Sequence, residues 1–159
     1  MKNKLKKIAQ DTIKNTEDSL KYMASFGIKP EGNIELFRSP EARQKSIDTI
    51  PYKHKEEQIV VYETTEFSAQ CPFSGLPDYG KLKIEYIPGT RYLELKSLKY
   101  YLVSWRNIGL SQEEITATVF SDIKKFLKDP KYLMLETRYN IRGGIETTCK
   151  IDSREQRKK

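Results

Sequence analysis

Alternating apolar and polar positions predict two strands in the first half of the chain. Residues 58–67 are rich in Val, Tyr and Thr, which are enriched in strands. In residues 79–88, the apolar side chains of Leu82, Ile84 and Tyr86 occupy every second position. Because side chains alternate between the two faces of a strand, this second segment predicts a strand with one buried face.

Apolar residues at helical spacing predict two helices next. The first covers residues 93–106, and the second begins at Ser111 and ends before Pro130. Ser111 is followed three residues later by Glu114, which is the pattern of a capping box at a helix start. The apolar positions are Leu95, Leu98, Leu102 and Trp105 in the first helix, and Ile115, Val119, Ile123 and Phe126 in the second.

Two further alternating segments complete the pattern. Residues 132–139 and 144–151 each place apolar or small side chains on one face, and the loop 140–144 predicts a hairpin between them. The order is therefore strand, strand, helix, helix, strand, strand. This order predicts an α+β architecture, an antiparallel sheet with its helices grouped on one face.

Both ends of the chain are basic. Residues 2–26 have apolar positions near helical spacing with lysines between them, so they predict an amphipathic helix. Such a helix can pack on its own protein or bind a membrane or an acidic partner. Residues 31–57 are interrupted by prolines and predict irregular structure.

Composition adds two expectations. The 159 residues predict one domain, yet only 37% are apolar and 32% are charged. We expect a modest core that contacts between subunits complete. The formal net charge of +7 attracts anions, such as nucleic acid or a phosphorylated cofactor, or else serves only solubility.

The chain contains two cysteines, Cys71 and Cys149, and one histidine, His54. This inventory predicts neither a disulfide framework nor a zinc site of the usual type. No apolar run approaches 18 residues, and the Lys-rich start has no apolar signal-peptide region. We therefore expect a cytoplasmic protein without a membrane partner, in which Cys71 is a free thiol.

Cys71 and Asp78 are the first candidates for chemistry. Cys71 ends a strand pattern and enters a Pro/Gly turn, which suits an accessible nucleophile, although buried structural cysteines are common. Seven residues later Asp78 could exchange a proton beside the thiol, or it could serve a turn. The sequence leaves both alternatives open.

Cationic and acidic residues form a second group. Lys96 and Lys99 lie one helical turn apart, and Arg142 precedes two glycines, so the three could hold phosphate groups or lie on a solvated face. Glu113 lies in the first turn of the second helix. It could complement the helix dipole or accept hydrogen bonds from a purine-like ring.

These residues resemble a known family. The run 66–78, EFSAQCPFSGLPD, is similar to the stretch E-F-x-x-x-C-P-x-(T/S)-G-x-P-D of the QueF enzymes, the NADPH-dependent 7-cyano-7-deazaguanine reductases of the unimodular type. The run 94–99, ELKSLK, resembles the E-(S/L)-K-(S/A)-x-K signature of that family, and residues 142–145 also match. The resemblance covers roughly residues 31–152.

The resemblance implies a tunnelling fold like that of GTP cyclohydrolase I, in which several subunits join their sheets into a barrel with active sites at subunit interfaces. It implies a catalytic domain at 31–152, a basic N-terminal helical extension at 1–30 and a basic C-terminal tail at 153–159. The expected protein is a homo-oligomer that acts in queuosine-type tRNA modification.

The resemblance also implies the reaction. Cys71 would attack the nitrile of 7-cyano-7-deazaguanine to form a thioimide, Asp78 would donate a proton, and NADPH would reduce the adduct to 7-aminomethyl-7-deazaguanine. The cofactor-binding residues would be Lys96, Lys99 and Arg142. The substrate-binding residues would be Leu93, Glu94, Leu95, Gln112 and Glu113, and no metal is expected.

Gln112 departs from the family pattern, because most members carry a His immediately before the Glu that matches Glu113. A Gln can hydrogen-bond but cannot donate a proton as an acid. Two alternatives follow: a QueF-like amidinotransferase that makes archaeosine on tRNA, and a non-enzymatic module that binds a purine or nucleic acid through Lys and Arg.

Overall fold

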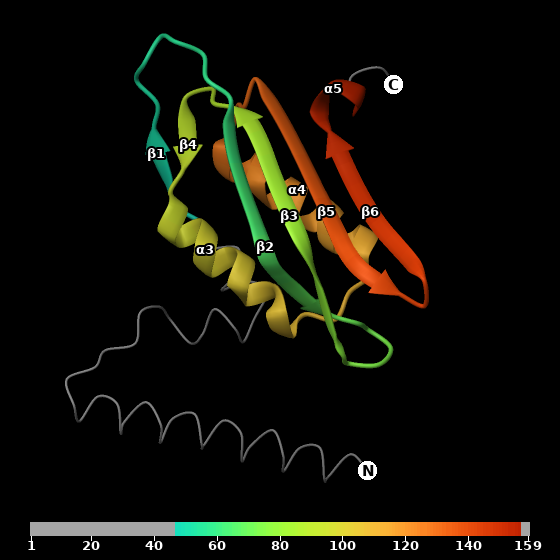
Figure 1. Cartoon of the computed structure of the whole chain (residues 1–159). Coiled ribbons are helices and arrows are strands. Elements are labelled where there is room, and N and C mark those ends of the chain that lie inside the picture. Colours follow the sequence, from blue (N-terminus) through green and yellow to red (C-terminus); the bar gives the residue numbers. More distant parts are fainter. Residues whose placement is uncertain (1–46, 157–159) are drawn as a thin grey trace, which may run out of the picture. The chain divides into compact units, whose positions relative to one another are not determined.

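The centre of the fold is a four-stranded antiparallel sheet in the order β2-β3-β5-β6 (Figure 1). The structure is a computed structural model that describes residues 47–156. The four strands are β2 (Val60–Gln70), β3 (Pro77–Ile87), β5 (Tyr132–Arg142) and β6 (Ile145–Asp152). The expected helix at 2–26, the extension at 1–30 and the end of the tail lie outside the described residues.

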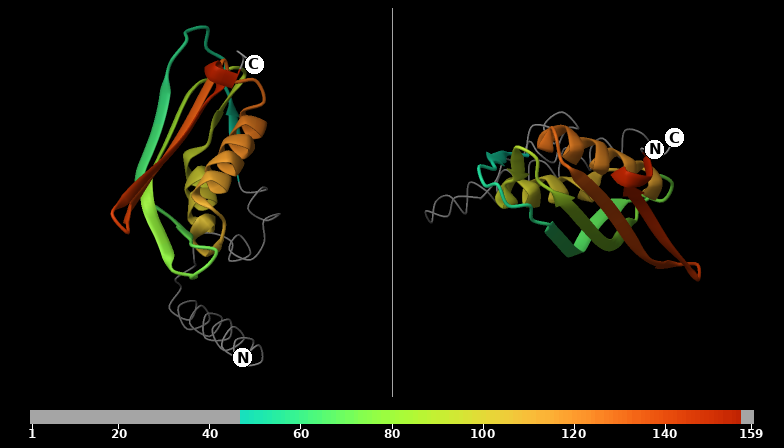
Figure 2. Two further views of the ribbon diagram at one scale, coloured as in Figure 1. Left: turned by 90° about the vertical axis from the view of Figure 1, so that its right-hand side faces the viewer. Right: turned by 90° about the horizontal axis from the view of Figure 1, so that it is seen from above.

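Helices cover one face of this sheet. They are α3 (Leu95–Val103), the 3-10 helix η2 (Ser104–Asn107) and α4 (Gln112–Leu127), and a short helix α5 (Ser153–Gln156) follows β6. Figure 2 shows α3 and α4 on the same side of the sheet. The expected α+β class, with an antiparallel sheet and helices on one face, is confirmed.

Two short strands were missed by the sequence pattern. β1 (Thr49–Pro51) pairs antiparallel with β4 (Arg91–Leu93) in a separate two-stranded sheet. The sequence predicts irregular structure at 31–57, and it includes residue 93 in a helix. Three-residue strands carry too few positions to show alternation, so pairing with a distant segment decides their conformation.

The core lies between the sheet and the helices. Leu82, Ile84 and Tyr86 of β3 are no more than 1% exposed, as their alternation predicts. Tyr101 and Trp105 pack against them from the helical side as part of the same buried cluster. The apolar stripe predicted for α3 is wrong at Leu95, which is 60% exposed. Ser97 and Tyr101 face the core instead.

The helix starts are fixed by their caps. The Ser111 hydroxyl accepts a hydrogen bond from the Glu114 N–H at 3.2 Å, and the Glu114 carboxylate accepts from the Ser111 N–H, so the predicted capping box is confirmed. Glu94 caps α3, because its carboxylate accepts hydrogen bonds from the N–H groups of Lys96 and Ser97. These hydrogen bonds lower the pKa of Glu94.

Two β-bulges change which side chains face the helices. Between the pairs Thr64–Leu82 and Phe67–Gly80, β2 advances three residues while β3 advances two. The same shift occurs on β5 between Tyr139 and Arg142. One extra residue reverses the alternation beyond it, so each strand presents the other set of side chains to the helices after its bulge.

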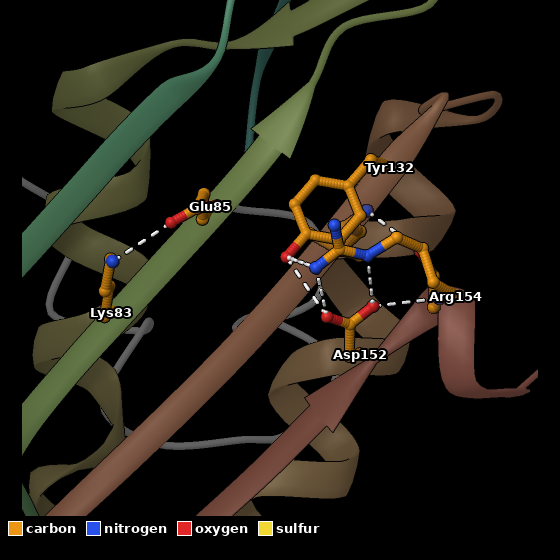
Figure 3. A network of polar contacts seen from close by, with 7 residues as sticks. Lys83, Glu85, Tyr132, Asp152 and Arg154 are labelled. Atoms are coloured by element: carbon orange, nitrogen blue, oxygen red, sulfur yellow. Dashed lines mark hydrogen bonds and ion pairs between the residues drawn. The ribbon is translucent and has the colours of Figure 1, made fainter.

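A polar cluster holds the end of β6 on the face opposite the helices (Figure 3). Arg154 donates hydrogen bonds to the buried Asp152 carboxylate and to the Tyr132 hydroxyl, and its guanidinium lies 4.1 Å from the centre of the Tyr132 ring. Lys83 and Glu85 form an ion pair nearby, at 3.0 Å. The cluster anchors the first residues of the expected tail at 153–159 to the sheet.

Within residues 47–156, none of the helices combines the length and the apolar character that crossing a membrane requires.

Candidate active site

Cys71 lies directly after β2, in the loop that leads to β3. The Cys71 N–H donates to the Leu76 carbonyl at 2.9 Å, and the Gly75 N–H donates to the Cys71 carbonyl at 2.9 Å. Gly75 has a φ of 68°, a left-handed conformation that glycine adopts without a Cβ penalty. The loop is therefore a closed turn that holds a half-buried thiol at the lower end of the sheet in Figure 1.

Hydrogen-bond donors surround the Cys71 sulfur. The Ser74 hydroxyl, the N–H groups of Ser74 and Phe73, and the Arg142 side chain together lower the pKa of Cys71 to about 7. A thiol with this pKa is substantially a thiolate at neutral pH, and the thiolate is the nucleophilic form. The lowered pKa of Cys71 is the feature that a nucleophilic cysteine requires.

Asp78 is buried next to this loop. It lies on β3 directly opposite Ala69 of β2, and it is 5% exposed. Its carboxylate forms an ion pair with Arg142, which satisfies the rule that buried charges are paired. Asp78 is part of a strand, so the alternative that it serves only a turn is excluded for this structure.

Arg142 joins the two groups. It was expected to contact a cofactor, and the structure places its guanidinium against Asp78; it is also the smallest of the contributions that lower the pKa of Cys71. Its side chain remains 46% exposed. A thiol and a carboxylate from neighbouring positions of the sequence and a guanidinium from a distant strand thus form one cluster.

Gln112 and Glu113 lie at the same end of the sheet, in the first turn of α4. The chain reaches them from Ile108, whose carbonyl accepts a hydrogen bond from the Gln70 N–H at 3.0 Å. Gln70 immediately precedes Cys71, so one backbone contact ties the loop of the nucleophile to the start of α4. Glu113 is exposed and its carboxylate is accessible to a ligand.

Leu93, Glu94 and Leu95 lie elsewhere in the chain. The Leu93 carbonyl accepts a hydrogen bond from Tyr62, which precedes Cys71 by most of the length of β2. At about 3.3 Å per strand residue, the nine residues from Tyr62 to Cys71 span roughly 30 Å along the strand. Leu93 is buried at 1% exposure, whereas Leu95 is exposed. Because Leu93 contacts Tyr62, the expected pocket residues 93–95 lie at the other end of the sheet from Gln112 and Glu113.

Lys96 and Lys99 belong to this second group. Both are exposed on α3, one turn apart, and the Lys99 ammonium lies 5.1 Å from the centre of the Tyr100 ring. Exposed ammonium groups at this spacing suit phosphate binding. Within one chain they do not join the cluster of Cys71, Asp78 and Arg142.

Ser74 and Tyr139 were missed by the sequence reasoning. Ser74 is the first cause of the lowered pKa of Cys71, and a hydroxyl three residues after a cysteine in a tight turn is the signal that could have found it. Tyr139 of β5 is buried, and burial is the main reason that its pKa is raised. Its hydroxyl has no hydrogen-bond partner among the described residues, and nothing in the alternation of β5 marks it.

No group of His, Cys, Asp and Glu within residues 47–156 is arranged to bind a metal ion. His54 is exposed, as expected for a residue between two lysines.

Comparisons with known proteins identify the family. Residues 77–158 match the family described as QueF-like protein. The chain is 48% identical over 132 residues to the NADPH-dependent 7-cyano-7-deazaguanine reductase of Thermotoga petrophila, covering 82% of this chain and 95% of that protein. It is 47% identical over 102 residues to the enzyme of the same name from Caldicellulosiruptor bescii, covering 64% and 77%.

A solved structure has the same fold. The archaeosine synthase QueF-Like in its apo form superposes with a TM-score of 0.54 at 21% identity, covering 64% of this chain and 96% of that one. At this identity the similarity concerns the fold alone. The family match and the curated relatives carry the assignment, and this chain belongs to the QueF family.

Proposed function

We propose that this chain is an NADPH-dependent reductase that converts the nitrile of 7-cyano-7-deazaguanine into the primary amine of 7-aminomethyl-7-deazaguanine. The observation that carries the proposal is the Cys71 thiol, with a pKa near 7, beside the buried carboxylate of Asp78. It stands in a chain that is 48% identical to a relative named for this reaction.

The first step is covalent. The Cys71 thiolate attacks the nitrile carbon, so that a C–S bond forms and one π bond of the nitrile breaks. The nitrogen takes a proton that Asp78 relays, and the product is a thioimide. Because the proton that leaves the sulfur arrives at the nitrogen, the addition needs no other reactant.

Reduction of the adduct needs hydride. When bound, NADPH would supply one hydride per molecule, and a nitrile requires two hydrides to become an amine. The exposed Lys96 and Lys99 have the charge and spacing to hold its phosphate groups. The C–S bond would break between the two reductions, which returns Cys71 to its thiolate form, and the nitrogen would take one further proton from solvent in the second reduction. A reduced Cys71 fits the cytoplasm expected from the sequence.

Glu113 and Gln112 are proposed to recognise the deazaguanine ring. The exposed Glu113 carboxylate can accept hydrogen bonds from adjacent N–H groups of the base, and the Gln112 amide can donate to a ring acceptor. Both lie at the Cys71 end of the sheet. Leu93, Glu94 and Leu95 would line the pocket from a second subunit.

We infer that the complete site lies between two copies of the chain in a barrel of tunnelling-fold subunits. Within one chain, Leu93 contacts Tyr62, which lies roughly 30 Å along β2 from Cys71 at strand spacing. Around Cys71 the apolar side chains of Phe73, Ile141 and Ile145 are 98%, 67% and 70% exposed. β2 and β6 are outer strands of the sheet, and unpaired strand edges readily pair with another chain.

The direct test is NADPH oxidation with the free nitrile base. We expect absorbance at the NADPH band to fall only when 7-cyano-7-deazaguanine is present, with two NADPH consumed per amine formed. Cys71→Ala should abolish the reaction, whereas Cys149→Ala, which removes the other thiol, should retain it. Turnover driven by ammonium on deazaguanine-modified tRNA, with NADPH inert, would favour an amidinotransferase instead.

A further inference from the structure

Arg142 reaches Asp78 only because β5 contains a bulge. Arg142 lies opposite Ile145, and Tyr139 lies opposite Thr147, so three residues of β5 match two of β6. Directly opposed side chains share a face of the sheet. The extra residue therefore turns Arg142 to the face of Tyr139 and Asp78, whereas uninterrupted alternation would place it with Arg138 on the other face.

We propose that Arg142 is a positioning residue that engages Asp78 in the ligand-free site, and that a phosphate group of the cofactor releases Asp78 by drawing the guanidinium away. The proposal rests on the proposed function, because it concerns the same thiol and carboxylate. It makes cofactor binding the event that frees the proton relay.

The ion pair conflicts with the task of Asp78. To relay a proton from the thiol to the nitrile nitrogen, the carboxylate needs a free oxygen and must bind that proton for a moment. A guanidinium bonded to the carboxylate occupies its lone pairs. Within residues 47–156, the Asp78 carboxylate forms its ion pair with Arg142. This ion pair must open during the reaction, because the proton needs a free carboxylate oxygen.

The Arg142 side chain is the more accessible partner of the ion pair. Its side chain is 46% exposed, whereas that of Asp78 is 6% exposed, so the guanidinium is the partner that solvent or an anion can reach. It ends β5 at a turn in which Gly143 and Gly144 have φ values of 57° and 81°. A guanidinium matches the geometry of phosphate oxygens at least as well as that of a carboxylate.

The surrounding titratable groups do not replace Arg142. They are Asp78 on β3, Tyr139 on β5, Glu113 on α4 and Cys149 on β6. Burial raises the pKa of Tyr139 and of Cys149, so both remain neutral near pH 7. Among the groups of residues 47–156 that act on the Cys71 thiol, Arg142 is the cation.

The test measures the apparent pKa of Cys71 from the pH dependence of its alkylation by iodoacetamide. The protein carries Cys149→Ala, so that one thiol reacts, and NADP⁺ serves as the ligand because it cannot deliver hydride. We expect Arg142→Gln to slow alkylation at pH 7 about twofold, because fewer molecules are thiolates and Arg142 contributes least among the groups that lower this pKa. Arg142→Lys, which keeps the charge, should lose less.

Saturating NADP⁺ should shift the wild-type profile to higher pH and leave the Arg142→Gln profile unchanged. The matched control is Arg138→Gln, which removes a guanidinium from the same strand but from an ion pair with Glu146. It should behave like the wild type in both conditions. Thermal melting of each variant checks that it is folded.

Two results would overturn the proposal. One is an Arg142→Gln profile that matches the wild type without ligand. The other is a shift on NADP⁺ addition that is equal in both proteins, since the cofactor charge would then act directly. If either occurs while the nitrile still drives NADPH oxidation, only the role of Arg142 fails; absence of NADP⁺ binding to the wild type would overturn both proposals.

Discussion

At the scale of single residues, the site depends on one thiol whose environment is polar on several sides. The Ser74 hydroxyl, two loop N–H groups and Arg142 all lower the pKa of Cys71, to about 7. Hydrogen bonds that the charged form accepts favour that form. The loop therefore prepares the nucleophile before any substrate arrives.

Ser74→Ala should raise the apparent pKa of Cys71. Because a donor to the thiolate is lost, alkylation at pH 7 should be about two- to fivefold slower, while the limiting rate at high pH stays the same. The measurement is the rate of iodoacetamide modification between pH 5 and 10. Ser121→Ala, at an exposed position of α4, is the control. An unchanged pH profile for Ser74→Ala would remove Ser74 from the site.

Asp152 should contribute to stability in a pH-dependent way. Its hydrogen bonds and ion pair with Arg154 lower its pKa from 3.8 to about 2, so the folded protein favours the carboxylate. That stability is present above about pH 4 and is lost as the pH falls toward 2. At pH 7, Asp152→Asn should therefore unfold at a lower urea concentration than the wild type. The difference between the two midpoint concentrations should close near pH 2.

The comparison for this prediction is Asp48→Asn, which changes an exposed aspartate outside the cluster. It should match the wild type across the range. A gap for Asp152→Asn that is the same at pH 2 as at pH 7 would contradict the role given to the ion pair.

At the scale of elements, the β-bulges in β2 and β5 determine which side chains near Cys71 face the helical side of the sheet. Where a strand has no bulge, its alternation predicts the buried face correctly, as Leu82, Ile84 and Tyr86 of β3 show. Beyond the bulges, Phe67 of β2 and Arg142 of β5 face the helical side, whereas uninterrupted alternation along each strand would turn them to the other face; the sequence placed Arg142 in the hairpin loop 140–144. An extra residue leaves no mark in hydrophobic spacing, so the pairing of Arg142 with Asp78 could not be predicted.

Other parts of the site could be predicted. The order of the strands and helices followed from their periods, and the start of α4 followed from the capping box at Ser111. The sequence also marked Cys71 and Asp78 together. Glu94 shows the limit, because the same carboxylate that matches a family motif also caps α3, and one residue can serve both a cap and a ligand.

Gly80 should be essential for the close contact between β3 and β5. A Cβ there would lie 2.5 Å from the Arg138 carbonyl oxygen and 3.0 Å from the Tyr139 Cα, both of which are backbone atoms. Gly80→Ala should therefore lower the free energy of unfolding by about 1–3 kcal/mol, measured by urea denaturation. Gly109→Ala, whose Cβ would meet its nearest neighbour at 3.5 Å, should cost less than Gly80→Ala. Equal costs would mean that strand spacing is not the limiting contact.

At the scale of the whole molecule, the expected site residues divide into two groups at opposite ends of the sheet. Cys71, Asp78 and Arg142 form one group, and the segment from Leu93 to Lys96 begins the other. Under the function proposed above, a site that needs both groups would be completed by a second copy of the chain. The polar composition and the exposed apolar side chains around Cys71 agree with such an assembly.

Mixing two inactive variants should restore activity if the site is shared. Cys71→Ala and the double variant Lys96→Ala/Lys99→Ala each lack one half of the site. After they are unfolded and refolded together, about a quarter of the sites should contain both intact halves by random assembly. The measurement is nitrile-dependent NADPH oxidation by the mixture. No recovery, with mixed oligomers verified by mass, would contradict a site between subunits.

The central claim is that Cys71 bonds to the nitrile carbon, and intact-protein mass spectrometry tests it most directly. Incubation with 7-cyano-7-deazaguanine without NADPH should add the mass of one whole substrate molecule per chain. Peptide mapping should locate the added mass on Cys71. Addition of NADPH should then remove the added mass, and Cys71→Ala should never gain it. A chain that reduces the nitrile while its mass stays unchanged under all these conditions would contradict the account.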